Sequence, residues 1–100
     1  MRIAAKKDDS HNRIKRTLES CGFSVADTYQ LGKDFPDMVA GRSGKNYLIE
    51  AKSKTGKLSI GQKRFADSWC GGYYVLRSAD DAINFLINSD VYRYRVGEWI

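Results

Sequence analysis

The sequence has no long apolar run, few cysteines, and no repeat, linker or low-complexity segment. A membrane helix needs about 20 consecutive apolar residues, so we expect no membrane partner. Cys21 and Cys70 stand alone, without the paired Cys or His spacing that binds zinc. We expect both to be small buried side chains in a reducing compartment, by default the cytoplasm. Residues 1–7 lack the apolar centre of a signal peptide.

The composition that remains is typical of a folded domain with a basic surface. The 100 residues are 42% hydrophobic and 29% charged, which argues against a disordered chain and allows a compact core. The 17 Lys and Arg exceed the 12 Asp and Glu, so the formal net charge is +5. This excess favours a polyanionic partner, but weakly, because many basic proteins bind none. We expect a single domain over residues 1–100.

The most informative pattern is a predicted β-hairpin in the middle of the chain. Two short apolar runs flank Ser43-Gly44, a pair that suits a two-residue turn. With this turn, Asp37 stands directly opposite Glu50, and because side chains alternate along a strand, Lys52 lies on the same face. A three-residue turn would shift the register by one and weaken this argument.

Two carboxylates that face each other on a sheet repel unless something neutralises them. Their oxygens are hard ligands, so we expect Mg²⁺ or Mn²⁺ to be bound by Asp37 and Glu50. Lys52 would then orient a water or stabilise charge that develops on a phosphate. The alternative is a solvated strand edge with a cross-strand salt bridge. Three charged residues beside an apolar strand are unusual for such an edge.

The letters FPD at Phe35–Asp37 and EAK at Glu50–Lys52 resemble the signature of the PD-(D/E)XK nuclease superfamily. In that signature a Pro-Asp precedes a strand with Glu-x-Lys. With Gln62 downstream, the segment is most similar to virus-type replication-repair nuclease (VRR-NUC) domains and archaeal Holliday-junction resolvases. The resemblance extends over about residues 9–86.

The resemblance implies a three-layer α/β/α fold like that of restriction endonucleases, with a central mixed sheet. It implies a Mg²⁺- or Mn²⁺-dependent DNA endonuclease in which Asp37, Glu50 and the Ala51 carbonyl bind the metal. Lys52 and Gln62 would complete the catalytic site. The expected substrate is branched DNA such as a Holliday junction, and the expected assembly is a homodimer. A viral or bacterial source fits the resemblance.

Two other classes of function remain open. One is a nucleic-acid-binding protein that keeps this fold without catalysis, and the other is a small interaction protein whose charged hairpin is only surface. Turnover separates the nuclease from the first alternative, and divalent-metal binding separates it from the second.

A first helix is predicted over residues 11–20, with Asp9 or Ser10 as its N-cap. Its apolar stripe consists of Ile14, Leu18 and Cys21. The resembling resolvases usually have a Glu at the start of this helix as a further metal ligand, and the sequence departs from them there. Asp9, His11 and Glu19 are the candidates for that position. For all three we expect a cap or a solvated surface rather than metal binding.

After the hairpin, Ser59 and Gln62 match a capping box at the start of a second helix. Gln62 also begins an apolar stripe with Phe65, Ala66 and Trp69, so a role as cap and a role in the site are weighed equally. The basic turn 53–57 precedes this helix and is expected to contact phosphate.

The remaining elements complete an order of helix, three strands, helix, strand, helix. The first strand is predicted at 23–29 and the last at 73–76. The third helix follows Ser78 as its cap, and its predicted buried stripe consists of Ala79, Ile83, Leu86 and Ile87. The segment Val91–Ile100 fits an edge strand, a dimer contact or an aromatic-basic DNA surface, and the sequence does not choose among them.

Overall fold

A four-stranded mixed sheet organises the chain in the computed structural model, which describes residues 9–97. Its strands lie side by side in sequence order: β1 (Ser24–Asp27), β2 (Met38–Arg42), β3 (Lys45–Ala51) and β4 (Tyr73–Leu76). β1, β2 and β3 form antiparallel pairs, whereas β4 runs parallel to β3. The parallel pair requires a crossover, and the chain makes it through a helix.

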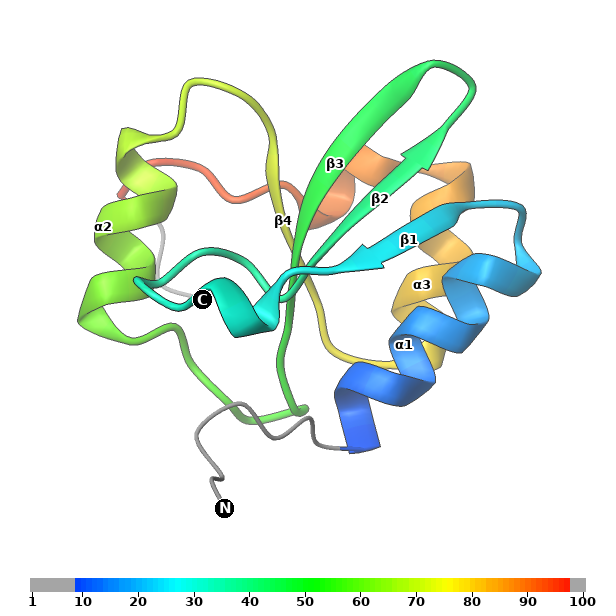
Figure 1. The fold of residues 1–100 in the computed structure, drawn as a ribbon, viewed down its shortest axis with the longest axis horizontal. Helices are drawn as coiled ribbons and strands as arrows, with labels where there is room; N and C mark the ends of the chain where they lie inside the picture. The colour runs from blue at the N-terminus through cyan, green and yellow to red at the C-terminus, as the bar shows by residue number, and fades with distance from the viewer. Residues whose placement is uncertain (1–8, 98–100) are drawn as a thin grey trace.

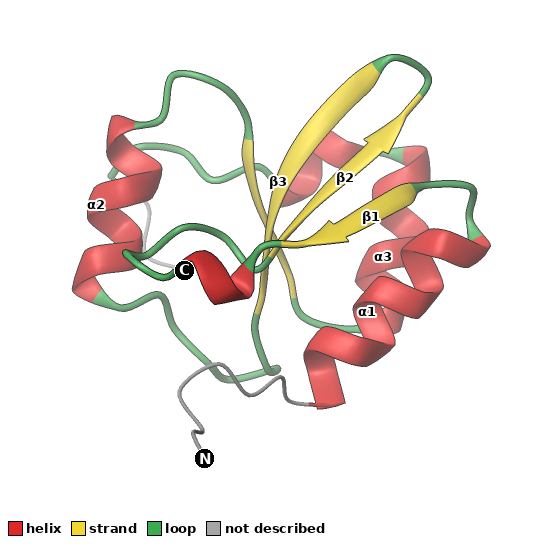
Figure 2. Cartoon of the chain, viewed as in Figure 1, coloured by secondary structure: helices red, strands yellow, loops and turns green. Residues whose placement is uncertain are grey.

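Helices cover both faces of this sheet. They are α1 (Asp9–Ser20), α2 (Ile60–Ser68) and α3 (Ala79–Ile87). α1 and α3 pack side by side on one face, and α2 lies on the other (Figures 1 and 2). The predicted element order and the three-layer α/β/α architecture are therefore confirmed. Within residues 9–97, no helix is both long and apolar enough to span a bilayer.

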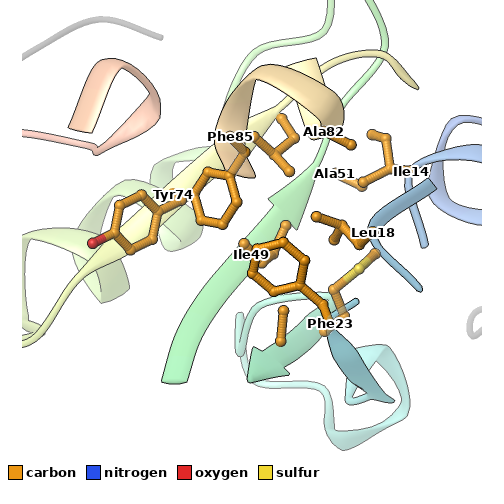
Figure 3. Packing of buried hydrophobic residues seen from close by; sticks show 11 residues of the cluster. Ile14, Leu18, Phe23, Ile49, Ala51, Tyr74, Ala82 and Phe85 are labelled. Carbon is orange, nitrogen blue, oxygen red and sulfur yellow. The ribbon is translucent and has the colours of Figure 1, made fainter. Parts of the chain in front are cut away.

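The larger core lies between the sheet and the pair α1 and α3. Ile14 and Leu18 of α1 are fully buried there, as their spacing predicted. Phe85 of α3 packs its ring against several aromatic side chains, with centroid distances of 5.1 Å to Tyr47 and 5.2 Å to Tyr74. Figure 3 shows Ile14, Leu18, Tyr74 and Phe85 gathered between the helices and the strands.

A second, smaller core lies under α2, because alternate residues of each strand point to opposite faces. On β4, Tyr74 and Leu76 belong to the larger core, and Tyr73 and Val75 to the smaller one. On β3, Ile49 and Ala51 belong to the larger core. The intervening Glu50 pairs with Val75 and therefore faces α2. This alternation places Glu50, the first residue of the Glu-Ala-Lys segment, under α2 on the second face of the sheet.

Two expectations about the helices are wrong. α1 begins at Asp9, so Asp9 and Ser10 form its first turn instead of capping it, and residue 8 lies outside the described part. In α3, the buried residues are Ala82 and Phe85, while the predicted stripe members Ile83, Leu86 and Ile87 are exposed. The Phe85 ring fits between the aromatic side chains of the strands, and this contact determines which face of α3 turns inward.

The predicted burial of the two cysteines is only partly correct. Cys21 is half-buried and packs against the larger core, whereas Cys70 is exposed beyond the end of α2. Both are free thiols.

The segment after α3 has the character of a rudimentary edge strand. A short 3₁₀ helix, Ser89–Tyr92, is followed by an isolated antiparallel bridge between Arg93 and Tyr74. The backbone N–H of Tyr94 then donates to the carbonyl of Tyr73 at 2.7 Å. Trp99 and Ile100 lie outside the described residues, so the role of the whole of Val91–Ile100 stays a prediction.

Candidate functional site

The β2–β3 hairpin has the predicted two-residue turn. Ser43 and Gly44 have φ of 54° and 79°, the left-handed conformations that a mirror-image turn requires. The ladder from this turn ends with Met38 opposite Ile49. The prediction of both the turn and the register is confirmed, since the next pair along the ladder is Asp37 and Glu50.

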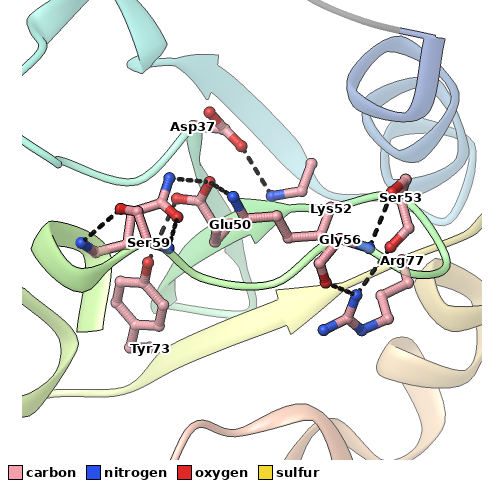
Figure 4. A network of polar contacts seen from close by, with 10 residues as sticks. Asp37, Glu50, Lys52, Ser53, Gly56, Ser59, Tyr73 and Arg77 are labelled. Atoms are coloured by element: carbon pink, nitrogen blue, oxygen red, sulfur yellow. Dashed lines mark hydrogen bonds and ion pairs between the residues drawn. The ribbon is translucent and has the colours of Figure 1, made fainter. Parts of the chain in front are cut away.

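The carboxylates of this pair lie at the end of the hairpin that faces α2. Glu50 is 2% exposed. Its Oε1 accepts a hydrogen bond from the Tyr73 hydroxyl at 3.3 Å, and its Oε2 accepts one from Gln62 Nε2 at 3.2 Å. Lys52 Nζ lies 4.0 Å from the same Oε2. Figure 4 shows the side chains of Glu50, Lys52 and Tyr73 converging on this end of the hairpin.

Asp37 is oriented by hydrogen bonds from two backbone N–H groups of neighbouring segments. Its Oδ2 accepts a hydrogen bond from the Ala51 N–H at 2.9 Å, and its carbonyl accepts one from the Thr28 N–H at 2.8 Å. The preceding residues are also held, because Pro36 is fully buried and the Phe35 ring packs edge-on against Phe65 of α2 at 5.4 Å. The Phe-Pro part of the motif thus anchors the Asp against the second face of the sheet.

The electrostatics of the pair are strained without a cation. Burial raises the pKa of Glu50 well above its usual range, and the nearby Asp37 raises it further. The charge of Lys52 and the hydrogen bond from Tyr73 lower the pKa of Glu50, but by less than burial and Asp37 raise it. Burial and the Glu50 carboxylate in turn raise the pKa of Tyr73. A cation between the carboxylates would stabilise their charged forms.

The donor set fits a hard divalent cation. Two facing carboxylates and the Ala51 carbonyl are oxygen ligands, and Mg²⁺ commonly uses one or two carboxylates while keeping waters for substrate phosphates to replace. No group of three or more His, Cys, Asp and Glu side chains suited to a metal occurs among residues 9–97. The two carboxylates and the carbonyl would thus hold such a cation in part and leave positions for water and substrate phosphate.

Gln62 combines the two roles that the sequence left open. The Ser59 hydroxyl accepts from the Gln62 N–H at 3.1 Å, and Gln62 Oε1 accepts from the Ser59 N–H at 2.8 Å, so the capping box is present. The other end of the same amide, Nε2, donates to Glu50. The capping prediction is confirmed, and a part in catalysis stays a prediction.

A pair of substitutions at Gln62 separates these roles. Gln62→Ala is expected to lower the free energy of unfolding by about 1 kcal/mol, the usual contribution of a helix cap, and to impair cleavage. Gln62→Glu retains the acceptor that caps the helix but loses the donor to Glu50 and adds a third negative charge. Melting curves recorded beside cleavage assays should therefore show a Gln62→Glu protein that is impaired in cleavage although its helix cap is retained. Normal cleavage by both variants would leave Gln62 as a cap only.

The loop after Lys52 is held in place by Arg77, at the end of β4. The Arg77 guanidinium donates from Nη1 to the carbonyls of Ser53, at 2.8 Å, and Gly56 (Figure 4). Lys54 and Lys57 of this loop are exposed, and the phosphate contact expected of the loop stays a prediction.

Sequence reasoning missed both Tyr73 and Arg77. Alternation along 73–76 was the available signal for Tyr73, since it places this residue and Val75 on one face. No local signal identifies Arg77, because its contact with the loop depends on the parallel pairing of β4 with β3.

Among the first-helix candidates, Asp9 and Glu19 are exposed, as expected, but His11 is not. His11 is 3% exposed, and its Nε2 lies 2.9 Å from Asp27 Oδ1, at the end of β1. Lys15 Nζ lies 2.8 Å from the other oxygen. Burial by itself raises the pKa of Asp27, but the hydrogen bonds from Lys15 and His11 outweigh it and lower that pKa to about 2. The expectation of a cap or a solvated surface is therefore wrong for His11.

Comparison with known proteins bears on the fold. Neither a family model nor a curated protein sequence matches this chain. A solved structure described as a VRR_NUC domain superposes with a TM-score of 0.67 and 16% sequence identity, and the match covers 81% of this chain and 98% of that one. At this identity the match is evidence for the fold. The chain therefore has the fold of a VRR_NUC domain, the fold that the resemblance of its Pro-Asp and Glu-Ala-Lys segments implied.

Proposed function

We propose that this protein is a Mg²⁺- or Mn²⁺-dependent DNA endonuclease that hydrolyses phosphodiester bonds. The observation that supports it best is the buried Glu50 facing Asp37, with Lys52 on the same face, in a chain with a VRR_NUC fold. A buried carboxylate that faces a second, half-buried one, with one neighbouring amine, is costly for stability and has a ready explanation in metal-assisted hydrolysis. The net charge of +5 suits a DNA substrate.

Each residue has a distinct part in this proposal. Asp37, Glu50 and the Ala51 carbonyl would hold the cation, which when bound would lower the pKa of an attacking water and neutralise charge on the scissile phosphate. Gln62 and Tyr73 orient the Glu50 carboxylate through one oxygen each. Lys52 presents a positive charge 4.0 Å from Glu50 Oε2, where it can stabilise the developing phosphate charge or orient the water.

The direct test compares substrates and metals in one experiment. The protein is incubated with linear duplex, flap, replication-fork and four-way-junction DNA, with Mg²⁺, with Mn²⁺ and with EDTA. Metal-dependent internal cleavage of at least one substrate is expected. Binding without turnover on all of them would replace the proposal with its alternative.

That alternative is a DNA-binding protein without catalysis on the same fold. The observation that favours it lies in α1, where His11, one of the three candidates for the extra ligand, is paired with Asp27. The third class, a hairpin charged only on its surface, disagrees with the 2% exposure of Glu50.

The proposal extends to a homodimer that prefers branched DNA, because a four-way junction offers two symmetric cleavage points and two-fold dimers are the commonest assemblies. Exposed Val91 and Val96 provide apolar surface in the C-terminal segment, at 61% and 74% exposure. Arg93 and Arg95 would lie near the interface or the DNA.

Light scattering at micromolar concentration is expected to give a dimer. A monomer that cuts linear and branched DNA equally would contradict the prediction, and a dimer without branch preference would contradict its resolvase part.

A further inference from the structure

The residue that follows β1, Thr28, holds the backbone on both sides of Asp37. The Thr28 hydroxyl donates to the Pro36 carbonyl at 2.7 Å, and the Thr28 N–H donates to the Asp37 carbonyl at 2.8 Å. These carbonyls belong to the peptide groups before and after the Cα atom of Asp37. Because a residue has only two soft backbone dihedrals, fixing both peptide groups determines the direction in which its side chain leaves the backbone.

The ladder between β1 and β2 ends just before this point, at the pair of Asp27 and Met38. Pro36 has no N–H and cannot donate to a neighbouring strand. The Thr28 hydroxyl supplies a contact there instead of its common one. Thr28 stands at the N-cap of a 3₁₀ helix, Tyr29–Leu31, but within the described residues its side chain makes no capping hydrogen bond. The hydroxyl is thus directed across to Pro36.

Contacts with α1 determine where Thr28 lies. The preceding residue, Asp27, has one carboxylate oxygen 2.9 Å from His11 Nε2 and the other 2.8 Å from Lys15 Nζ. The following residue, Tyr29, packs its ring edge-on against the buried His11 ring, with 5.2 Å between the centroids. Both chain neighbours of Thr28 are therefore held by the helix, so Thr28 is a fixed support for the segment beside it.

The carboxylate of Asp37 lies against β3, where its Oδ2 accepts the hydrogen bond from the Ala51 N–H at 2.9 Å. This hydrogen bond reports the position of the carboxylate in the absence of metal. A shift of the Asp37 backbone would lengthen it and would move a proposed cation ligand. Groups that orient a metal ligand without binding the metal themselves commonly change metal affinity about 10- to 100-fold when they are removed.

We propose that Thr28 is a positioning residue of the cleavage site, whose hydroxyl and N–H hold Asp37 so that its carboxylate meets the Ala51 N–H and the cation. The inference rests on the proposed nuclease function and adds to it a residue that acts only through Asp37. Thr28→Val is the informative change, because valine keeps the branched shape but leaves the Pro36 carbonyl without the hydroxyl donor. Thr28→Ser keeps the donor and should restore the behaviour of the unaltered protein.

Amide hydrogen exchange followed by NMR in EDTA tests the geometry without metal or DNA. In Thr28→Val, the Ala51 N–H is expected to exchange about tenfold faster relative to the Lys52 N–H. The Lys52 N–H donates to the Leu76 carbonyl of β4 at 3.0 Å, so it reports the stability of the sheet and not the position of Asp37. A merely structural role of Thr28 would accelerate both amides alike. That result, or no change in either amide, would overturn the inference.

Mn²⁺ binding without DNA, measured by electron paramagnetic resonance, gives a second test. Thr28→Val should bind Mn²⁺ about tenfold more weakly than the unaltered protein, and Thr28→Ser should bind it as the unaltered protein does. The Mg²⁺ concentration for half-maximal cleavage should rise by the same factor, while the cleavage rate at saturating Mg²⁺ changes less. Normal Mn²⁺ affinity in Thr28→Val would overturn the inference.

Thr17→Val is the matched control. The Thr17 hydroxyl also donates to a backbone carbonyl, that of Arg13 within α1 at 2.8 Å, so the same group is lost away from Asp37. This variant should leave the amide ratio and the Mn²⁺ affinity unchanged. If Thr28→Val does not fold, Thr28→Ala decides by the same comparisons. An unaltered protein that binds no Mn²⁺ and cuts no DNA would contradict the nuclease proposal, and the amide ratio would still decide whether Thr28 positions Asp37.

Discussion

Asp37→Asn, Glu50→Gln and Lys52→Ala are each expected to reduce metal-dependent DNA cleavage by about 1,000-fold or more while the protein stays folded. The two carboxylate changes remove negative charge from the proposed cation ligands but keep the shape of the side chain. Lys52→Ala removes the cation beside Glu50 Oε2. Because the proposed site needs all three groups at once, the three losses should be similar in size and should not add when combined.

The controls for this prediction come from the same hairpin and from the surface. Lys45→Ala removes an exposed amine at the turn end of β3, and Asp90→Asn removes an exposed carboxylate after α3. Both should retain the cleavage rate of the unaltered protein. Purified, folded protein that cleaves at that rate with any one of the three site substitutions would remove the residue from the proposed site.

Glu50→Gln is also expected to stabilise the metal-free protein at neutral and alkaline pH. Burial and Asp37 raise the folded-state pKa of Glu50 above the unfolded value near 4.5. The folded state therefore holds a proton that the unfolded state releases, and stability falls as pH rises from the unfolded pKa towards the folded one. Each pKa unit of the shift corresponds to about 1.4 kcal/mol. Glutamine has no proton to lose, so its variant avoids this decline.

Urea or thermal unfolding in EDTA between pH 5 and pH 8 measures the effect. The difference between Glu50→Gln and the unaltered protein should increase with pH, and Mg²⁺ should stabilise the unaltered protein more than the variant. The titration of Asp27 does not affect stability between pH 5 and pH 8. Its pKa is lowered to about 2, so its contribution to the free energy of unfolding is lost only in more acidic solution. A pH-independent difference would show that Glu50 is not strained in the folded protein.

The hairpin was predictable because its information is local. The Ser43-Gly44 turn accepts positive φ at both residues, and the alternation of side chains then determines which residues share a face. The facing of Asp37 and Glu50 follows from counting along two short strands. The capping box of Ser59 and Gln62 is equally local, since it joins groups three residues apart.

Contacts between elements distant in the sequence could not be predicted in the same way. Both apolar stripes of α3 have helical spacing, and only the Phe85 ring among the strand aromatics determines which one is buried. His11 is buried against Asp27 because β1 passes under α1, a neighbour that the helix pattern does not identify.

The sequence by itself therefore determined the element order, the hairpin register and the shared face of Asp37, Glu50 and Lys52, because turns, caps and alternation act over a few residues. The tertiary structure alone decided that Glu50 is buried under α2 with Tyr73 and Gln62 on its oxygens. It also decided that Arg77 holds the basic loop. These features depend on the parallel pairing of β4 with β3 and on the packing of α2 against the sheet, which no short sequence pattern specifies.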